Sequence, residues 1–193
     1  YPEGTIVSTG LSKWCGAGGW RLGFFAIPNQ LSELKNSLKI LCSESFTSVS
    51  APIQYAAVEA YRGDHSAYLN SIKKILLLVG TYVYENLISN TINVTKPEGG
   101  FYLMPEFTNA KFSSSSKMCK DILNKTGVAL LPGSDFGLNS NKMYARLSYT
   151  DFDGNNFLNN TSGSKKLDDS DLRKYAPNIV EGVIKLKEWS NSL

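Results

Sequence analysis

The chain has 193 residues, of which 42% are hydrophobic and 19% are charged, and its formal net charge is +3. This length is enough to bury the core of one domain or one and a half. The basic residues are scattered rather than gathered in a stripe or patch, which excludes the usual footprint of a nucleic-acid-binding protein. The longest apolar run, residues 75–80, is far too short to span a bilayer, so no membrane partner is expected.

The cysteines and the start of the chain bear on its compartment. Three widely spaced cysteines without a Cys-x-x-Cys pair disfavour a disulfide framework and a zinc site. A single histidine leaves no His-rich metal site. Because no secretory signal is visible either, we expect a cytoplasmic protein that holds no metal.

A glycine-rich loop near the N-terminus holds one lysine and one arginine between two predicted strands. Thr5–Val7 is β-branched and predicts a strand, and the apolar run Leu22–Ile27 predicts a buried strand. Lys13 therefore lies on a loop held by a scaffold, where reactive groups usually sit. Arg21 carries the planar, permanently charged fork that suits a phosphate dianion.

Two interpretations of this loop remain open on spacing alone. Lys13 attacks a carbonyl only as the free amine, so its pKa must be lowered by desolvation or by a neighbouring cation. Trp14 and Trp20 are candidates for the first effect, and Arg21 is the candidate for the second. The alternative is a surface turn with two solvated cations. A nucleotide-binding loop is disfavoured, because no Gly-Lys-Ser/Thr opens a helix here.

Helical patterns follow the loop. Leucines at helical spacing, with Ser32 as the expected N-cap, predict a helix that ends at about residue 44. A second helix is expected over 52–63, with Pro52 in its first turn. Ser66 is then expected to cap a long helix that runs through Leu87. Gly80 is expected to mark a bend in it.

From residue 92 onward the pattern alternates short strands with a helix. The segment Asp151–Ser164, rich in Asn, Gly and Ser, predicts a flexible loop. Pro177 is expected to start a last helix behind a short turn at Asp171–Tyr175. The predicted elements between them are strands at Ile92–Thr95, Phe101–Met104, Val128–Leu131 and Met143–Ser148, and a helix at Ser116–Lys125.

Four motifs in chain order carry a family resemblance. The first is Ser12-Lys13, a seven-residue gap and Arg21-x-Gly23 before an apolar strand. The others are Pro97-Glu98-Gly99-Gly100-Phe101-Tyr102, the strand and Pro-Gly-x-x-Phe-Gly loop of Val128–Gly137, and Ala145-Arg146-Leu147-Ser148-Tyr149. Together they resemble the C-terminal portion of the class I/II pyridoxal-phosphate-dependent aminotransferases of fold type I, of the aspartate/alanine type. Each later motif is weak alone, but four in order over most of the chain are specific.

The resemblance assigns roles to single residues. It implies that Lys13 forms the Schiff base with pyridoxal 5′-phosphate and moves the proton between the substrate Cα and the cofactor C4′. It implies that Arg146 pairs with the α-carboxylate of the substrate in a bidentate geometry that lysine cannot reproduce. The substrates implied are an amino acid and a 2-oxo acid.

The phosphate group of the cofactor is assigned to the same loop. The resemblance implies that Arg21 binds it, with the hydroxyl of Ser12 or Ser8 nearby. Many relatives carry a phosphate-binding serine three residues before the lysine, where this chain has Gly10.

The fold that the resemblance implies is α/β. Residues 1–65 would be the end of the large-domain sheet, 66–90 a long helix that connects the domains, and 91–193 a small α+β C-terminal domain. The full-length enzyme is expected to be a homodimer.

In that family, several cofactor contacts precede the lysine, whereas only a short segment does here. We therefore expect a C-terminal fragment that is inactive alone, binds the cofactor weakly at best and exposes apolar surface around Val7, Phe24 and Phe25. Two alternatives stay open. One is a non-catalytic fragment with an assembly or regulatory role, and the other is a different pyridoxal-phosphate reaction of the same fold, such as a racemase, lyase or synthase.

Overall fold

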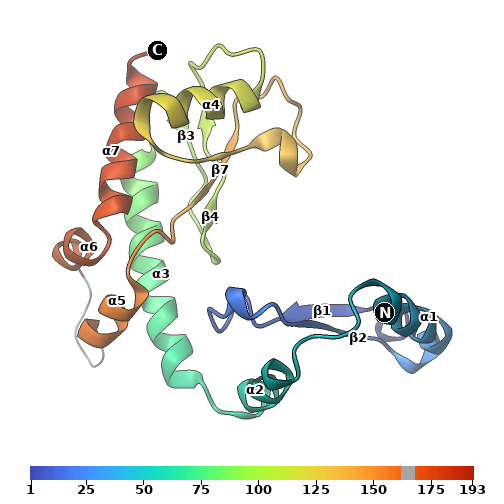
Figure 1. Ribbon diagram of the computed structural model, residues 1–193. Coiled ribbons are helices and arrows are strands. Elements are labelled where there is room, and N and C mark those ends of the chain that lie inside the picture. The colour runs from blue at the N-terminus through green and yellow to red at the C-terminus, as the bar shows by residue number, and fades with distance from the viewer. Residues whose placement is uncertain (162–167) are drawn as a thin grey trace. The chain divides into compact units, whose positions relative to one another are not determined.

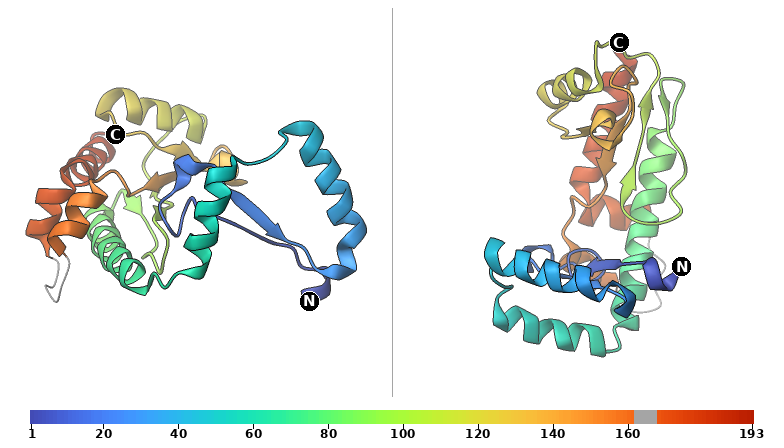
Figure 2. Two further views of the ribbon diagram at one scale, coloured as in Figure 1. Left: turned by 60° about the horizontal axis from the view of Figure 1, so that its bottom comes forward. Right: turned by 90° about the vertical axis from the view of Figure 1, so that its right-hand side faces the viewer.

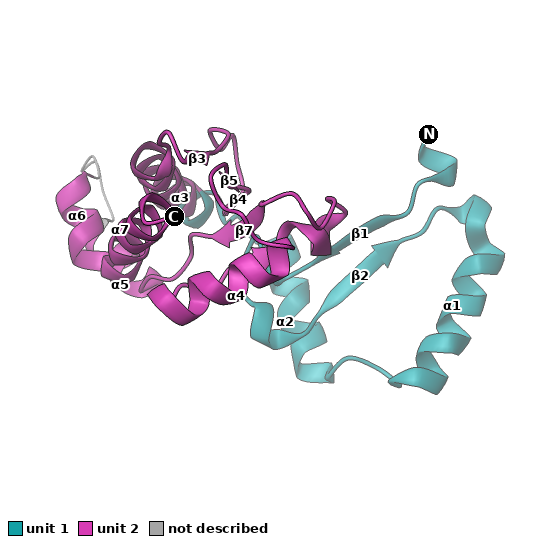
Figure 3. Cartoon of the chain, turned by 90° about the horizontal axis from the view of Figure 1, so that it is seen from above, with its two compact units in different colours: residues 1–69 teal, residues 70–193 magenta. Residues whose placement is uncertain are grey.

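The computed structural model describes residues 1–161 and 168–193, which form two compact units, Tyr1–Leu69 and Asn70–Leu193 (Figures 1 and 3). Each unit has a hydrophobic cluster of its own. The finer division into 1–65, 66–90 and 91–193 stays a prediction. Over the residues that the structure describes, no helix combines the length and the apolar character needed to cross a membrane.

Unit 1 begins with a two-stranded antiparallel hairpin and continues with two helices. The hairpin register pairs Val7 with Ala26 and Gly10 with Gly23. The first strand therefore begins two residues later than predicted. The elements are η1 (Pro2–Gly4), β1 (Val7–Gly10), η2 (Gly18–Trp20), β2 (Gly23–Ala26), η3 (Asn29–Leu31), α1 (Ser32–Ser45) and α2 (Ala51–Arg62).

The core of unit 1 is small and lies where the loop end of the hairpin packs against α2. Leu11, Leu22 and Ala57 are its buried members. The helix α1 lies at the other end of the hairpin and contains no buried residue (Figure 3). Side chains packed around the buried three are Trp14, Cys15, Ala17, Val49, Ile53 and Ala60.

The prediction of a buried strand at Leu22–Ile27 is wrong for β2, whose four residues are all exposed. Leu22 alone is buried, because it faces α2 at the loop end. The expected apolar surface is confirmed: Val7 is 54% exposed, Phe24 43% and Phe25 62%. A run of apolar residues predicts the strand correctly, but burial also needs a second layer on its face.

The two predicted serine caps are displaced by one position. Ser32 already has helical dihedral angles and is the first residue of α1, after Leu31. Ser66 is likewise the first residue of the long helix α3 (Ser66–Leu87), which confirms the extent predicted for it. Asp64 supplies the side-chain acceptor there, with Oδ1 2.9 Å from the Ser66 N–H. The Ser66 hydroxyl also donates to this oxygen, and the hydroxyl and the N–H together hold the pKa of the Asp64 carboxyl below its usual value.

Unit 2 combines short antiparallel strands with helices. Beyond α3, whose first turn belongs to unit 1, the elements are β3 (Ile92–Asn93), β4 (Tyr102–Leu103), β5 (Glu106–Phe107), α4 (Ser115–Thr126), β6 (Leu131–Pro132), η4 (Gly133–Phe136), β7 (Ala145–Ser148), α5 (Gly154–Thr161), α6 (Asp169–Tyr175) and α7 (Pro177–Asn191). The strand β7 lies between β4 and β6 in a three-stranded sheet, and β3 pairs with β5. The helices α3 and α7 run beside each other (Figures 1 and 2).

The core of unit 2 joins α3 and α7 to the sheet. Val79 and Val83 of α3, Leu186 of α7 and Ala145 of β7 are almost fully buried in one cluster. Gly80 lies in this contact: a Cβ placed there would be 3.0 Å from the Tyr149 hydroxyl oxygen. The helix α3 continues through Gly80, so the glycine permits close packing of the Tyr149 ring.

Two helices occupy segments for which the sequence predicts no helix. The prediction of a flexible loop at Asp151–Ser164 is wrong for Gly154–Thr161, which form α5. Residues 162–164 of the predicted loop lie outside the described part of the chain. Phe157 anchors α5, since it is fully buried between the rings of Phe152 and Tyr175. The predicted turn at Asp171–Tyr175 is a helix, α6, which a capping box at its N-terminus stabilises.

The short strands are shorter than predicted. Pairing in β6 covers only Leu131 and Pro132, whereas a strand was predicted over Val128–Leu131. The segment that precedes β6 diverges from β7 and borders a cavity instead. The β-ribbon of β3 and β5 includes Glu106–Phe107, a segment for which the sequence predicts no strand.

Candidate active site

Residues 11–22, called the lysine loop below, join β1 to β2, and Lys13 lies at a turn within them. The loop is closed at its base, where the Leu11 N–H donates to the Leu22 carbonyl at 3.2 Å. A second bond, from the Ala17 N–H to the Leu11 carbonyl at 3.1 Å, folds the loop back on itself. The Gly16 N–H donates to the Lys13 carbonyl at 3.3 Å, so residues 13–16 form the turn that carries the exposed lysine.

The turn depends on a glycine. Gly16 has a φ of +66°, in the left-handed region that L side chains rarely adopt. A Cβ at this position would also come within 3.3 Å of the Tyr68 hydroxyl oxygen. Both the conformation and the contact favour glycine directly after the Lys13–Cys15 segment.

Aromatic rings anchor the lysine loop to the C-terminal end of α2. The Trp14 ring lies 5.5 Å from the Tyr61 ring and 5.9 Å from the His65 ring, measured between centroids. Tyr61 in turn meets Phe24 of β2 edge to face at 5.1 Å. A ring nitrogen of His65 lies 3.0 Å from the Ala60 carbonyl oxygen. The residue next to Lys13 is thus held by packing, so the turn has a defined place on unit 1.

Arg21 stands at the end of the same loop in a strained conformation. Its φ of 53° and ψ of 44° are left-handed, which costs a non-glycine residue roughly 1–2 kcal/mol. One of its five N–H donors reaches the Gly18 carbonyl at 2.7 Å. Strain of this kind collects at functional sites, where the surrounding structure enforces it.

The two candidate serines occupy different elements. Ser12 is half-buried on the lysine loop, directly before Lys13. Ser8 is exposed on β1, opposite Phe25 in the hairpin register. The structure therefore brings Lys13, Ser12 and Arg21 together on one closed loop and places Ser8 on the strand that enters it. An amine for a carbonyl and a guanidinium for a phosphate are the chemistry that this loop offers.

Arg146 lies in unit 2, on the central strand β7. Its guanidinium carbon is 4.4 Å from the centroid of the Tyr102 ring and 4.4 Å from that of the Phe136 ring. The side chain is half-buried, and the ion pairs found within residues 1–161 and 168–193 do not include it. A guanidinium held by two rings, and outside the ion pairs that the described residues form, is suited to receive a carboxylate from a ligand.

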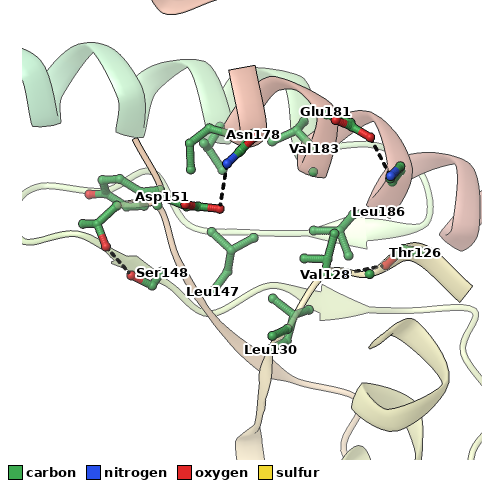
Figure 4. A pocket seen from close by; sticks show the side chains of 18 residues that line it. Thr126, Val128, Leu130, Leu147, Ser148, Asp151, Asn178, Glu181, Val183 and Leu186 are labelled. Atoms are coloured by element: carbon green, nitrogen blue, oxygen red, sulfur yellow. Dashed lines mark hydrogen bonds and ion pairs between the residues drawn. The ribbon is translucent and has the colours of Figure 1, made fainter. Parts of the chain in front are cut away.

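A cavity of about 580 Å³ in unit 2 does not coincide with these residues (Figure 4). The polar groups around it pair with one another. The Asn178 amide donates to Asp151 Oδ2 at 3.4 Å, and Lys185 pairs with Glu181 at 2.6 Å. The pair with Lys185 also holds the pKa of the Glu181 carboxyl below its usual value. Lys185 and Glu181 thus form an ion pair and Asp151 accepts a hydrogen bond from a neutral amide, so these groups are already engaged with one another.

Sequence reasoning assigned no role to Tyr102 and Phe136, although both lie within the quoted motifs. The strand register contained the missing signal: Tyr102 pairs with Ser148, which is two residues from Arg146 on the same face of β7. Such diagonal neighbours in a sheet are within reach of aromatic and long side chains.

Comparison with known proteins identifies the family. The family model "Aminotransferase class I and II" matches residues 1–156, which contain all four motifs. An aspartate aminotransferase of Bacillus sp. (strain YM-2) is 33% identical over 150 residues, covering 75% of this chain and 36% of the relative. A probable N-acetyl-LL-diaminopimelate aminotransferase of Bacillus subtilis (strain 168) is 35% identical over 148 residues, covering 75% of this chain and 35% of the relative.

Solved structures match almost the whole chain. The alanine aminotransferase from Pyrococcus furiosus superposes with a TM-score of 0.74 at 26% identity, covering 97% of this chain and 42% of that one. The aromatic aminotransferase from Pyrococcus horikoshii OT3 gives a TM-score of 0.75 at 24% identity, covering 99% and 44%.

The chain belongs to the aminotransferase class I and II family. Its α/β fold is that of the matched part of these aminotransferases, and the resemblance found in its motifs is confirmed. The chain spans about a third of the length of the curated relatives that it matches.

Pyridoxal phosphate, on which this family generally depends, fits the donors of the lysine loop. The loop presents a primary amine for the cofactor aldehyde, and a guanidinium and a hydroxyl for its phosphate, on Lys13, Arg21 and Ser12. The left-handed backbone of Arg21 and the fixed turn at Lys13 are the structural observations that accord with this fit.

Proposed function

We propose that the protein to which this chain belongs is a pyridoxal-phosphate-dependent aminotransferase, which transfers an amino group between an amino acid and a 2-oxo acid. One observation carries the proposal. In a chain of this family, Lys13 and Arg21 lie on a single loop that hydrogen bonds close and aromatic packing anchors. Transfer of an amino group is the reaction named for the relatives reported above, which favours it over a lyase or synthase reaction.

The lysine loop binds the cofactor in this proposal. Arg21 directs its remaining N–H donors to the phosphate, and the hydroxyl of Ser12 or Ser8 donates to the same group. The Lys13 amine would hold the cofactor at its aldehyde group and, as the free base, would carry the proton between the substrate Cα and C4′ of the cofactor.

The substrate is oriented by its carboxylate. Arg146 binds that group through two parallel N–H···O bonds, which fixes the orientation of the substrate Cα–H bond relative to this guanidinium. When bound, pyridoxal phosphate supplies an electron sink for the pair released from that bond.

The substrate class follows from what Arg146 recognises. Every amino acid and 2-oxo acid carries the carboxylate next to the reacting carbon, so Arg146 admits the class without choosing among side chains. Relatives and structural neighbours are named for aspartate, alanine and aromatic amino acids. We propose a homodimer as the assembly of the complete enzyme, as expected for the family.

Equilibrium dialysis against pyridoxal phosphate tests the cofactor part of the proposal. The 193-residue chain is expected to bind one equivalent weakly but saturably, in addition to the non-saturating adducts on exposed amines. Lys13→Ala or Arg21→Gln is expected to weaken the saturable binding about tenfold or more, since each removes a direct bond. Lys74→Ala is the matched control, because Lys74 is an exposed lysine outside the lysine loop. Equal binding by all four proteins would contradict the proposal.

A further inference from the structure

Arg146 is placed by the pleat of its strand. Side chains alternate along β7, so Ala145 and Leu147 point into the core while Arg146 and Ser148 share the opposite face. The register pairs Tyr102 of β4 with Ser148, on that same face. The Tyr102 ring therefore reaches Arg146 as its diagonal neighbour across the sheet.

Phe136 reaches Arg146 from the other neighbour of the strand. It ends η4, whose first residue, Gly133, donates its N–H to the Tyr144 carbonyl at 2.8 Å. A Cβ on Gly133 would lie 2.8 Å from the Tyr144 Cβ, so the glycine allows η4 to approach the backbone of the sheet this closely. Gly137, with a φ of +82°, then terminates η4 directly after the phenylalanine. The backbone on both sides of Phe136 thus fixes where its ring lies.

The two rings leave the guanidinium one way to bind a ligand. Its carbon lies over both rings, 4.4 Å from each centroid, so the faces of two aromatic rings contact the planar group. Each ring attracts the cation through its π face and excludes water from that side. The N–H edge remains, which is the part that forms paired bonds with a planar carboxylate.

We propose that Tyr102 and Phe136 are positioning residues that hold the Arg146 guanidinium with its N–H edge toward the substrate carboxylate; this rests on the proposed function. Both rings are partly exposed, Tyr102 by 37% and Phe136 by 40%, so they flank the guanidinium at the surface. Without a ring, the long arginine side chain samples several rotamers and must be ordered when a carboxylate binds. Ordering one such side chain weakens binding by about three- to tenfold.

The test is a pyruvate titration of the ¹⁵N-labelled 193-residue chain, read on the Nε–Hε signals of its four arginines. The Arg146 signal is identified by its loss in Arg146→Lys. In the parent chain it is expected to shift saturably with pyruvate. Tyr102→Leu and Phe136→Leu are each expected to raise the dissociation constant for pyruvate about three- to tenfold, because the Arg146 side chain must then be ordered when the carboxylate binds. Tyr102→Phe keeps the ring and is expected to bind as the parent does.

The control is Tyr55→Leu, which makes the same chemical change at an 80% exposed tyrosine of α2 and is expected to leave pyruvate binding unchanged. Parent-like affinity in both leucine variants, read on an Arg146 signal that still shifts saturably with pyruvate, would overturn the positioning role and leave the proposed function intact. If the Arg146 signal of the parent chain does not shift when pyruvate is added, the inference is overturned. The cofactor part of the proposed function is tested separately, by the equilibrium dialysis.

A second measurement serves if a leucine variant fails to fold. In the unaltered chain, the two rings are expected to shift the Arg146 Nε–Hε signal upfield and to slow its exchange with water relative to the other arginines. If the Arg146 signal has the same chemical shift and the same exchange rate as those of the other three arginines, the contacts with Tyr102 and Phe136 are contradicted, and with them the positioning role.

Discussion

The link between Asp121 of α4 and Trp189 of α7 gives a stability prediction whose magnitude depends on pH. The indole N–H of Trp189 donates to Asp121 Oδ2 at 2.9 Å, and Lys125 lies 3.1 Å from the same oxygen. Trp189 is 4% exposed and meets the Phe107 ring edge to face at 5.4 Å, so the donor is held in place. The hydrogen bond from Trp189, followed by the contacts from Lys125, holds the pKa of the Asp121 carboxyl below its usual value.

The perturbation is Asp121→Asn, which keeps an acceptor oxygen and removes the charge. A hydrogen bond to a charged group contributes about 1.5–3 kcal/mol. The Asp121 side chain is 25% exposed, which favours the lower end of that range. The exposed pair with Lys125 adds about 0.3–0.5 kcal/mol. Since the amide still accepts from the indole, we expect a net loss of about 1 kcal/mol near pH 7.

The pH dependence follows from the direction of the shift. A carboxyl with a lowered folded-state pKa stabilises the fold fully above its unfolded pKa of about 3.9, and this contribution is lost as the pH falls through the folded pKa. Urea unfolding followed by circular dichroism should therefore show a constant gap between parent and Asp121→Asn from about pH 7 to 5, which narrows at lower pH. A gap that is independent of pH would refute the reasoning. Glu181→Gln, at the 63% exposed partner of Lys185, is the control and should leave stability nearly unchanged.

Two helix termini allow further predictions. Gly127 ends α4 with a φ of +75° and with open space around its Cα, so Gly127→Ala should destabilise the chain by about 1–2 kcal/mol through backbone strain alone. Gly154→Ala, at an open site without a positive φ, is its control, and an equal loss there would contradict this explanation. Asp168→Ala removes the capping box of α6 and should cost about 1 kcal/mol in urea unfolding, whereas no loss would show that α6 holds without the cap.

The long helix was predictable because one pattern runs without interruption through it. Apolar residues recur at helical spacing from residue 66 to 87, and this stripe faces the core of unit 2. The helix α5 was not predictable in the same way. Its sequence is mostly Asn and Gly, and its fully buried side chain is Phe157, whose ring partners Phe152 and Tyr175 lie outside the helix. Composition alone does not reveal such tertiary contacts.

Some features of the candidate site were likewise predictable from the sequence, and others were not. The spacing of Lys13 and Arg21 around three glycines was visible in the sequence, and the structure places both on one closed loop. The exposure of β2 was not visible, because burial of Phe24 and Phe25 depends on what covers the strand. The rings around Arg146 were hidden for a third reason. They come from segments about 44 and 10 residues away in the chain, and only the strand register and the course of η4 bring them together.

The central claim is that Lys13 is the lysine that binds pyridoxal phosphate, and covalent mapping tests it most directly. Pyridoxal phosphate forms adducts with many exposed amines, so the informative quantity is the distribution of label over the sixteen lysines of the chain. The measurement is borohydride reduction at substoichiometric pyridoxal phosphate, followed by peptide mass spectrometry. We predict that Lys13 carries most of the label and that inorganic phosphate reduces labelling there more than at Lys74. Label spread evenly over the exposed lysines, with Lys13 no more reactive than Lys74, would contradict the account.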